Sequence, residues 1–212
     1  MTRNGGTMDP RLLARASRAL SRRDPRLGTW IRRVGPCGLR QRGDPYTTLF
    51  HAVLNQQLAG AAAAAIGRRV RRLGDGRFPR PVALLALREE TLRSAGLSRR
   101  KVATLREIAE AFRSGHLSTR RLVRMNDLQV VETLTGIDGI GEWTAHMLLI
   151  FSLGRTDVLP LADFGVRKGA QRLFALSELP KRIELAQLGE PWRPYRSVAS
   201  WYLWQIAQAT PG

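Results

Sequence analysis

The sequence has almost no cysteine, since Cys37 is the only one among 212 residues. A single cysteine excludes an internal disulfide, a four-cysteine zinc site and a cysteine-ligated iron–sulfur cluster. Hydrophobic residues nevertheless make up 43% of the chain, which is enough to bury a core in one domain or in two closely joined lobes. We therefore expect an ordinary globular protein that needs neither disulfides nor a structural metal.

Long hydrophobic runs are also lacking. The first ten residues contain no apolar stretch like that of a signal peptide, and no run approaches the roughly 20 apolar residues that a membrane helix needs. We expect no membrane association and a cytoplasmic location, at the nucleoid if the organism is bacterial. The histidines, His51, His116 and His146, lack the spacing of metal ligands, and we interpret them as structural or solvent-facing.

Acidic residues are scarce relative to basic ones. The chain has 17 Asp and Glu against 35 Lys and Arg, which gives a net charge of +18. This excess is far larger than solubility requires, and most of it is arginine, whose planar guanidinium suits phosphate oxygens. Nucleic acid is the leading partner, although a high arginine content can also reflect a GC-rich genome.

Strand-like alternation is rare, whereas apolar residues recur three and four positions apart, which predicts a nearly all-helical chain. Asp44 before Pro45 is a typical helix start. Ser98 and Asn126 can also cap helices, and Gly115 can end one in a left-handed conformation. We predict helices after Asp44, over about 61–73, from Ser98 to Gly115, from Asn126 to Leu134, over 142–153, 163–174 and 194–209, and an opening helix marked by Leu12, Leu13, Ala16 and Leu20.

A glycine-punctuated turn between two amphipathic helices, at about 134–145, is the most specific local feature. Gly139 and Gly141 allow the backbone to turn tightly and to expose amide groups at a helix start, where a phosphate is favoured. Ile137 and Ile140 would anchor the turn in the core. The pattern predicts a phosphate-binding helix-hairpin-helix, with a plain helix–helix turn as the alternative.

A second segment, residues 157–168, follows the hairpin and places Asp163 three residues after Pro160. Together the two segments resemble the helix-hairpin-helix DNA glycosylases, most closely the 3-methyladenine DNA glycosylase II (alkylbase) branch. Residues 55–58 and 191–195 extend the resemblance, which covers roughly 44–205.

The resemblance implies an all-α fold of two lobes with a central cleft. One lobe would be residues 44–157 with the hairpin, and the other would be residues 1–43 plus 158–212 with the catalytic aspartate. Too few residues precede Asp44 for the long N-terminal α/β domain of some members, so we expect that domain to be absent. We also expect a monomer that acts on double-stranded DNA containing damaged bases and requires no cofactor.

Asp163 matches the catalytic carboxylate of that family. Aspartate is also a common helix N-cap, and the two roles are compatible, because amide hydrogen bonds and the helix dipole would hold the carboxylate ionised. An ionised carboxylate suits a transition state that resembles an oxocarbenium ion. We expect Asp163 to stabilise that cation, and whether it also orients or deprotonates the attacking water stays open.

Trp143 occupies the position where many members of the wider superfamily carry a lysine nucleophile. Tryptophan cannot attack the sugar, so the resemblance implies a monofunctional hydrolase that leaves an abasic site after removing alkylated bases such as 3-methyladenine and 7-methylguanine. Two alternatives stay open. One is a glycosylase for another class of lesion, and the other is a helix-hairpin-helix protein that binds DNA without catalysis.

The same resemblance assigns the remaining site residues. Trp143, Met147 and Trp201 would line the base pocket, where an indole face can stack on a flipped, positively charged base. We interpret Trp192 and Trp204 as core side chains.

DNA contacts are also assigned by resemblance. Gln57 would fill the gap left by the extruded base, and the other DNA-binding residues would be Gly139, Gly141 and Thr144. The backbone carbonyls of Thr135, Ile137 and Ile140 match positions that hold a sodium or potassium ion in related proteins.

Two positions depart from the family pattern. Asp138 stands where proline is usual and puts an acid beside the expected phosphate, which would weaken its binding. Ala162 replaces a polar or acidic residue that often precedes the catalytic aspartate, which suggests a less polar site.

Overall fold

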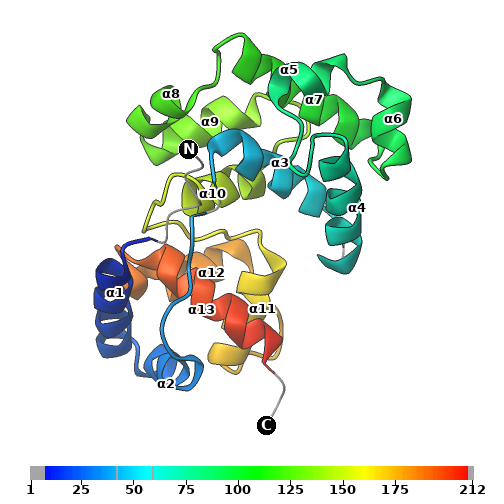
Figure 1. Ribbon diagram of the computed structural model, residues 1–212. Coiled ribbons are helices and arrows are strands. Elements are labelled where there is room, and N and C mark those ends of the chain that lie inside the picture. The colour runs from blue at the N-terminus through cyan, green and yellow to red at the C-terminus, as the bar shows by residue number, and fades with distance from the viewer. Residues whose placement is uncertain (1–7, 42, 59, 210–212) are drawn as a thin grey trace. The chain divides into compact units, whose positions relative to one another are not determined.

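The structure is a computed structural model that describes residues 8–41, 43–58 and 60–209, and within these ranges it contains helices and no strand. The predicted all-α class is therefore confirmed (Figure 1). No helix in the described ranges is both long and apolar enough to cross a membrane. The elements are α1 Pro10–Arg23, α2 Pro25–Val34, α3 Pro45–Asn55, α4 Gly60–Arg72, α5 Pro81–Ala86, α6 Glu89–Ser94, α7 Arg99–Arg113, α8 Thr119–Arg124, α9 Asp127–Thr135, α10 Glu142–Phe151, α11 Phe164–Leu173, α12 Arg182–Leu188, the 3-10 helix Glu190–Trp192 and α13 Arg196–Gln208.

The chain divides into two compact units. The hairpin unit is Arg42–Leu153, and the Asp163 unit combines Met1–Gln41 with Gly154–Gly212. The sequence-based division into 44–157 and the two flanking segments places the same motifs in separate units.

The hairpin unit has α3 and α7 at its centre. Helix α3 packs against α4, α7 and α10, and α10 also packs against α9 (Figure 1). The core side of α3 carries Leu49, Phe50 and Val53, which are fully buried. Phe50 stacks on Phe78 with ring centroids 4.3 Å apart, and Tyr46 meets Phe112 edge-on at 5.5 Å. These contacts hold the first half of α3 against α7 and against the segment between α4 and α5.

Helix starts in this unit follow the predicted capping chemistry. Asp44 accepts a hydrogen bond from the Thr47 amide, and Ser98 accepts one from the Lys101 amide. Asn126 forms a full capping box with Gln129. Each cap satisfies an amide that has no partner within its helix. These three predicted starts are confirmed.

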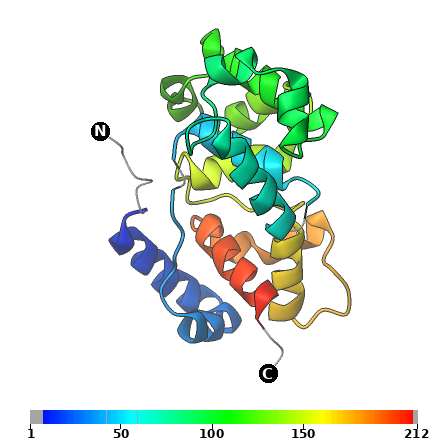
Figure 2. The same ribbon diagram turned by 45° about the vertical axis from the view of Figure 1, so that its right-hand side comes forward.

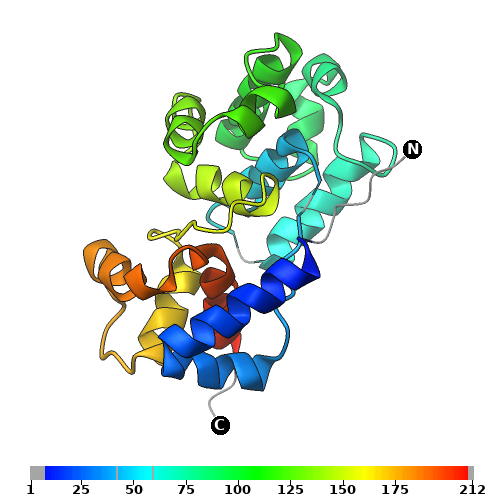
Figure 3. The same ribbon diagram turned by 90° about the vertical axis from the view of Figure 1, so that its left-hand side faces the viewer.

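The Asp163 unit is organised around the close pair α11 and α13, which lie side by side in Figure 2. Gly169 makes this approach possible, because a Cβ there would overlap the Leu203 carbonyl oxygen and lie 2.6 Å from its carbon. Helices α1 and α2 also pack together (Figure 3). Asp24, the N-cap of α2, accepts a hydrogen bond from the fully buried Trp192 indole at 3.1 Å, which confirms Trp192 as a core residue.

Candidate active site

Asp163 is the N-cap of α11, as predicted, and one oxygen of its carboxylate has two hydrogen-bond donors. Oδ1 accepts from the Val166 amide at 2.8 Å and from the Trp204 indole Nε1 at 2.8 Å. The residue is 9% exposed, and both of these contacts are polar. The N-terminal end of a helix favours a negative charge. The local structure therefore holds an anionic group in a fixed orientation at the start of α11.

Trp204 is the site residue that sequence reasoning missed. The prediction of a plain core side chain is wrong, because Trp204 is only partly buried and its indole N–H donates to Asp163. Gly165 leaves room for this contact, since a Cβ there would lie 2.8 Å from Trp204 Cδ1 and 3.2 Å from Asp163 Oδ1. A glycine two residues after an N-cap aspartate is the only local signal of a close neighbour.

Trp201 lies one turn before Trp204 on α13 and is also partly buried. Its ring meets Tyr202 edge-on at 4.9 Å, and Gly38 packs against it so closely that a Cβ there would lie 3.1 Å from Trp201 Cζ2. Trp201 thus belongs to the same unit as Asp163 and has a packed, defined position.

Gln57 lies in the short turn between α3 and α4 of the hairpin unit. It is exposed and has a φ of 53°, a left-handed conformation that is uncommon for residues other than glycine. The next residue, Leu58, is 37% exposed. The turn therefore presents a polar and an apolar side chain to the surface at the position predicted for gap filling.

The helix-hairpin-helix is present at the predicted position, with α9 and α10 as its two helices. Gly139 has a φ of 79°, and a Cβ there would overlap Thr104 Oγ1, so this position requires glycine. Ile137 and Ile140 are 8% and 5% exposed, which confirms that they anchor the turn. Gly141 is the exposed N-cap of α10.

Two hairpin amides have no acceptor among the described residues. They belong to Gly139 and Gly141. A third amide, that of Asp138, donates to Glu107 Oε2 at 3.2 Å. An unpaired amide at a helix start is a favourable position for an anionic oxygen. The hairpin can therefore bind a phosphate at its glycine amides, whereas the Asp138 amide already donates to Glu107.

Three predicted site residues lie on α10, and all of them are buried or partly buried. Thr144 is 1% exposed, and its hydroxyl accepts a hydrogen bond from the Gln56 side chain at 3.0 Å. Its hydroxyl therefore has a partner inside the hairpin unit. Met147 is 7% exposed, and Trp143 is partly buried.

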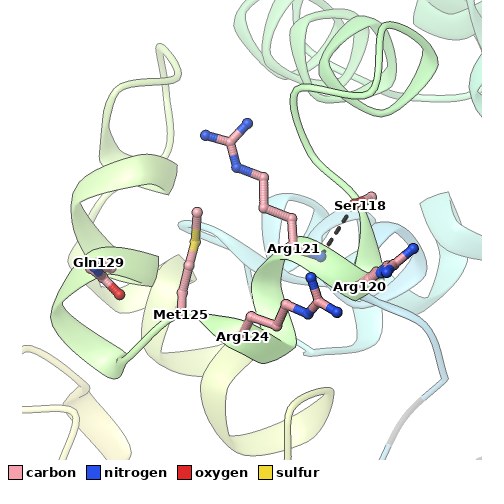
Figure 4. A pocket seen from close by; sticks show the side chains of 6 residues that line it. All are labelled: Ser118, Arg120, Arg121, Arg124, Met125 and Gln129. Carbon is pink, nitrogen blue, oxygen red and sulfur yellow. Dashed lines mark hydrogen bonds between the residues drawn. The ribbon is translucent and has the colours of Figure 1, made fainter.

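The hairpin unit has two surface hollows. The first, of about 410 Å³, is lined by Arg120, Arg121 and Arg124 together with Ser118, Met125 and Gln129. In Figure 4 the guanidinium of Arg121 points away from the other two. The second, of about 720 Å³, lies beside the hairpin at Gly136 and Ile137. Neither hollow is lined by Trp143 or Met147.

Comparison with protein families gives a match over most of the chain. Residues 50–194 match the family described as HhH-GPD superfamily base excision DNA repair protein. DNA-3-methyladenine glycosylase 1 of Schizosaccharomyces pombe is 39% identical over 170 residues, which cover 79% of this chain and 75% of that protein. The alkylbase DNA glycosidase-like protein mag2 of the same yeast is 33% identical, over 91% of this chain and 92% of that protein.

Solved structures agree with this match. The S. pombe 3-methyladenine DNA glycosylase Mag1, in complex with abasic DNA, superposes with a TM-score of 0.87 and 36% identity, over 92% of this chain and 97% of that one. A DNA-3-methyladenine glycosidase from Bacillus halodurans gives a TM-score of 0.79 and 38% identity, over 91% of this chain and 88% of that one. The chain is therefore a member of the helix-hairpin-helix (HhH-GPD) superfamily of base excision DNA repair proteins.

Proposed function

We propose that this protein is a monofunctional DNA glycosylase that hydrolyses the N-glycosidic bond of alkylated bases and leaves an abasic site. The observation that carries the proposal is the Asp163 carboxylate, held by two donors at the start of α11 in a chain of this family. The lesions we expect are 3-methyladenine and 7-methylguanine. The names of the yeast and Bacillus relatives support 3-methyladenine as one of them.

The chemistry requires stabilisation of positive charge on the sugar as the base departs. An alkylated purine with a positive charge is a good leaving group and needs little help from a general acid. The Asp163 carboxylate stabilises the oxocarbenium-like transition state by its charge, and its fixed orientation avoids reorganisation during the reaction. Water then adds to the sugar. Trp143 has no amine, so no covalent intermediate forms at that position and the strand stays intact.

Base recognition is assigned to the tryptophans. An indole face stacks on an extruded base and attracts a positively charged one, and such stacking is worth roughly 1–3 kcal/mol per base. Trp201, close in sequence to the Asp163 partner Trp204, and Trp143 at the start of α10 are the proposed stacking residues. Met147, one turn after Trp143 on α10, is the third proposed residue of the base pocket.

The hairpin is assigned to the DNA backbone. Its glycine amides would donate to phosphate oxygens, which positions the duplex without reading its sequence. The carbonyls of Thr135 and Ile140 accept no hydrogen bond from the described residues, while that of Ile137 accepts one from the Ile140 amide. We propose that these carbonyl oxygens hold a sodium or potassium ion, which would bring positive charge to the phosphate.

Gly141→Ala tests the hairpin assignment. No atom of the described protein lies within 4 Å of a Cβ at this position, and its φ of −99° suits alanine, so we expect unchanged thermal stability. The added methyl group would obstruct a phosphate approaching the Gly141 amide. We expect DNA affinity to fall about fivefold to tenfold in a fluorescence-anisotropy titration. An unchanged affinity at the same salt concentration would remove the hairpin glycine from the interface.

Trp204→Phe tests the second donor to Asp163. The benzene ring keeps most of the packing on α13 but lacks the N–H that reaches Oδ1. We expect the single-turnover rate of base release to fall roughly tenfold, the size of one charge-assisted hydrogen bond, while the affinity for abasic DNA stays constant. Equal losses of rate and affinity would instead indicate a general packing role. Trp30→Phe, at a partly buried position of α2, is the matched control.

A panel of defined lesions distinguishes the proposal from its alternatives. Duplexes that each contain one alkylated, oxidised or deaminated base would be incubated with the protein, and free base and strand breaks would be measured separately. We expect release of alkylated bases with strands that break only after alkali. Release of another class alone would support the first alternative, and binding without release would support the second. We also propose that the protein acts on double-stranded DNA as a monomer. Its proposed location is the cytoplasm, at the nucleoid in a bacterium.

A further inference from the structure

We propose that Lys101 and Gln56 are positioning residues that lock the turn carrying Gln57 onto the hairpin, so that gap filling and phosphate binding occur in one fixed geometry. This inference rests on the proposed function, because it assumes that Gln57 enters the duplex. It assigns a role in damage recognition to two residues, neither of which needs to contact the DNA.

Lys101 secures the end of α3. Its ammonium nitrogen donates to the carbonyls of Leu54 at 2.8 Å and Gln56 at 3.0 Å. Carbonyls at the C-terminal end of a helix lack donors within the helix and carry partial negative charge, so a cation is favoured there. The second carbonyl belongs to the residue directly before Gln57. Lys101 therefore fixes the backbone where the left-handed turn begins.

The environment of Lys101 shows that this contact is specific. Partial burial lowers the pKa of the Lys101 ammonium below its usual value. Removing an ammonium group from water is unfavourable unless hydrogen bonds replace the water. A lysine that only added surface charge would remain fully hydrated, whereas this one exchanges hydration for two backbone carbonyls.

Gln56 joins the same turn to the hairpin. Its side-chain nitrogen Nε2 donates to the Gly139 carbonyl at 3.0 Å and to the Thr144 hydroxyl at 3.0 Å. Gln56 thus accepts a hydrogen bond from Lys101 on its carbonyl and contacts both the hairpin turn and α10 through its side-chain amide. The same contact gives the buried Thr144 hydroxyl a hydrogen-bond partner.

Helix α7 supports both parts from one face. Lys101 and Thr104 are three residues apart, so their side chains lie on the same side of α7. Lys101 contacts the turn of Gln57, and Thr104 lies directly against Gly139. The turn and the hairpin are therefore both held in position by α7.

This arrangement has a consequence for damage recognition. A side chain that fills a gap in the base stack must be placed accurately while the hairpin holds the backbone, because small misplacements lose much of the benefit. A turn held in its left-handed conformation before binding also loses less conformational entropy on insertion. We expect the lock to strengthen binding to DNA with a gap in its stack, and to leave binding to undamaged DNA unchanged.

The test compares two affinities for each variant. One duplex contains a tetrahydrofuran abasic analogue, which leaves a gap, and the other is the undamaged sequence. For Lys101→Met we expect the preference for the abasic duplex to fall about tenfold, with undamaged affinity within twofold of wild type. Lys181→Met, on an exposed lysine of the other unit, is the control and should keep the wild-type preference.

A second pair of variants guards against misfolding of Lys101→Met. Thr144→Val removes the hydroxyl that accepts the hydrogen bond from Gln56, so it should reduce the preference for the abasic duplex. Thr144→Ser keeps a hydroxyl at this position and should keep the wild-type preference. Gly141→Ala should lower both affinities in parallel and leave their ratio unchanged.

The inference would be overturned if the wild-type protein showed no preference for the abasic duplex. It would also be overturned if folded Lys101→Met and Thr144→Val kept the wild-type preference, or if these two variants lost affinity for both duplexes in parallel. The readout is binding, so it is separate from the proposed catalysis. Failure of base release in the lesion panel would count against the function and not against the lock.

Discussion

Asp163→Asn is expected to lower the rate of base release at least about a thousandfold, because it removes the negative charge that stabilises the sugar cation. Asparagine has nearly the same shape and is an equally good N-cap, so its side-chain oxygen can still accept from the Val166 amide and from the Trp204 indole. Thermal stability and affinity for abasic DNA should therefore stay close to wild type. Single-turnover release from a duplex with one 7-methylguanine measures the effect.

Asp75→Asn is the matched control for this substitution. Asp75 is exposed in a turn with a φ of 51°, a conformation that asparagine also tolerates, and it lies in the hairpin unit. We expect its rate to equal that of wild type. A rate for Asp163→Asn above about a tenth of wild type would show that the charge is not the main source of catalysis.

Gly169→Ala is expected to have the largest effect on stability. The new Cβ would collide with the backbone of Leu203, and backbone atoms cannot move aside as the end of a flexible side chain can. Helices α11 and α13 would have to separate, and we expect a loss of about 2–4 kcal/mol in the free energy of unfolding, measured by urea denaturation. These helices carry Asp163 and Trp204, so the variant should also lose base release at temperatures where it remains folded.

Gly136→Ala provides the comparison for that loss. Gly136 has a φ of −70°, and the nearest atom to an added Cβ is the Thr133 carbonyl oxygen at 3.5 Å, an ordinary contact. Alanine should therefore be accommodated with little change in stability. Similar stabilities for Gly169→Ala and Gly136→Ala would contradict the close packing of α11 on α13.

The parts of the fold that could be predicted are those specified by neighbouring residues. Asp44, Ser98 and Asn126 mark helix starts because each side chain satisfies an amide within three residues. The short helices α5, α6 and α8 were not predicted. Each has six residues, fewer than two turns, so no apolar period can develop along it.

The candidate site shows the same limit. The position of Asp163 and its capping role follow from the local sequence, and so do the glycines of the hairpin. Trp204 and Lys101 were missed because their partners are distant, 41 residues away for the indole and 45 and 47 residues away for the ammonium group. No spacing rule links such positions, since packing of separate helices brings them together. The burial of Thr144 could not be predicted for the same reason, because Gln56 precedes it by 88 residues.

The measurement that most directly tests the central claim is chromatography of the bases released from methylated duplex DNA by the wild-type protein. If an ionised Asp163 catalyses hydrolysis of alkylated nucleotides, free 3-methyladenine and 7-methylguanine should accumulate in proportion to protein, and the strands should remain uncut until alkali is added. The absence of free base from every alkylated duplex, under conditions where the protein binds that DNA, would contradict the claim.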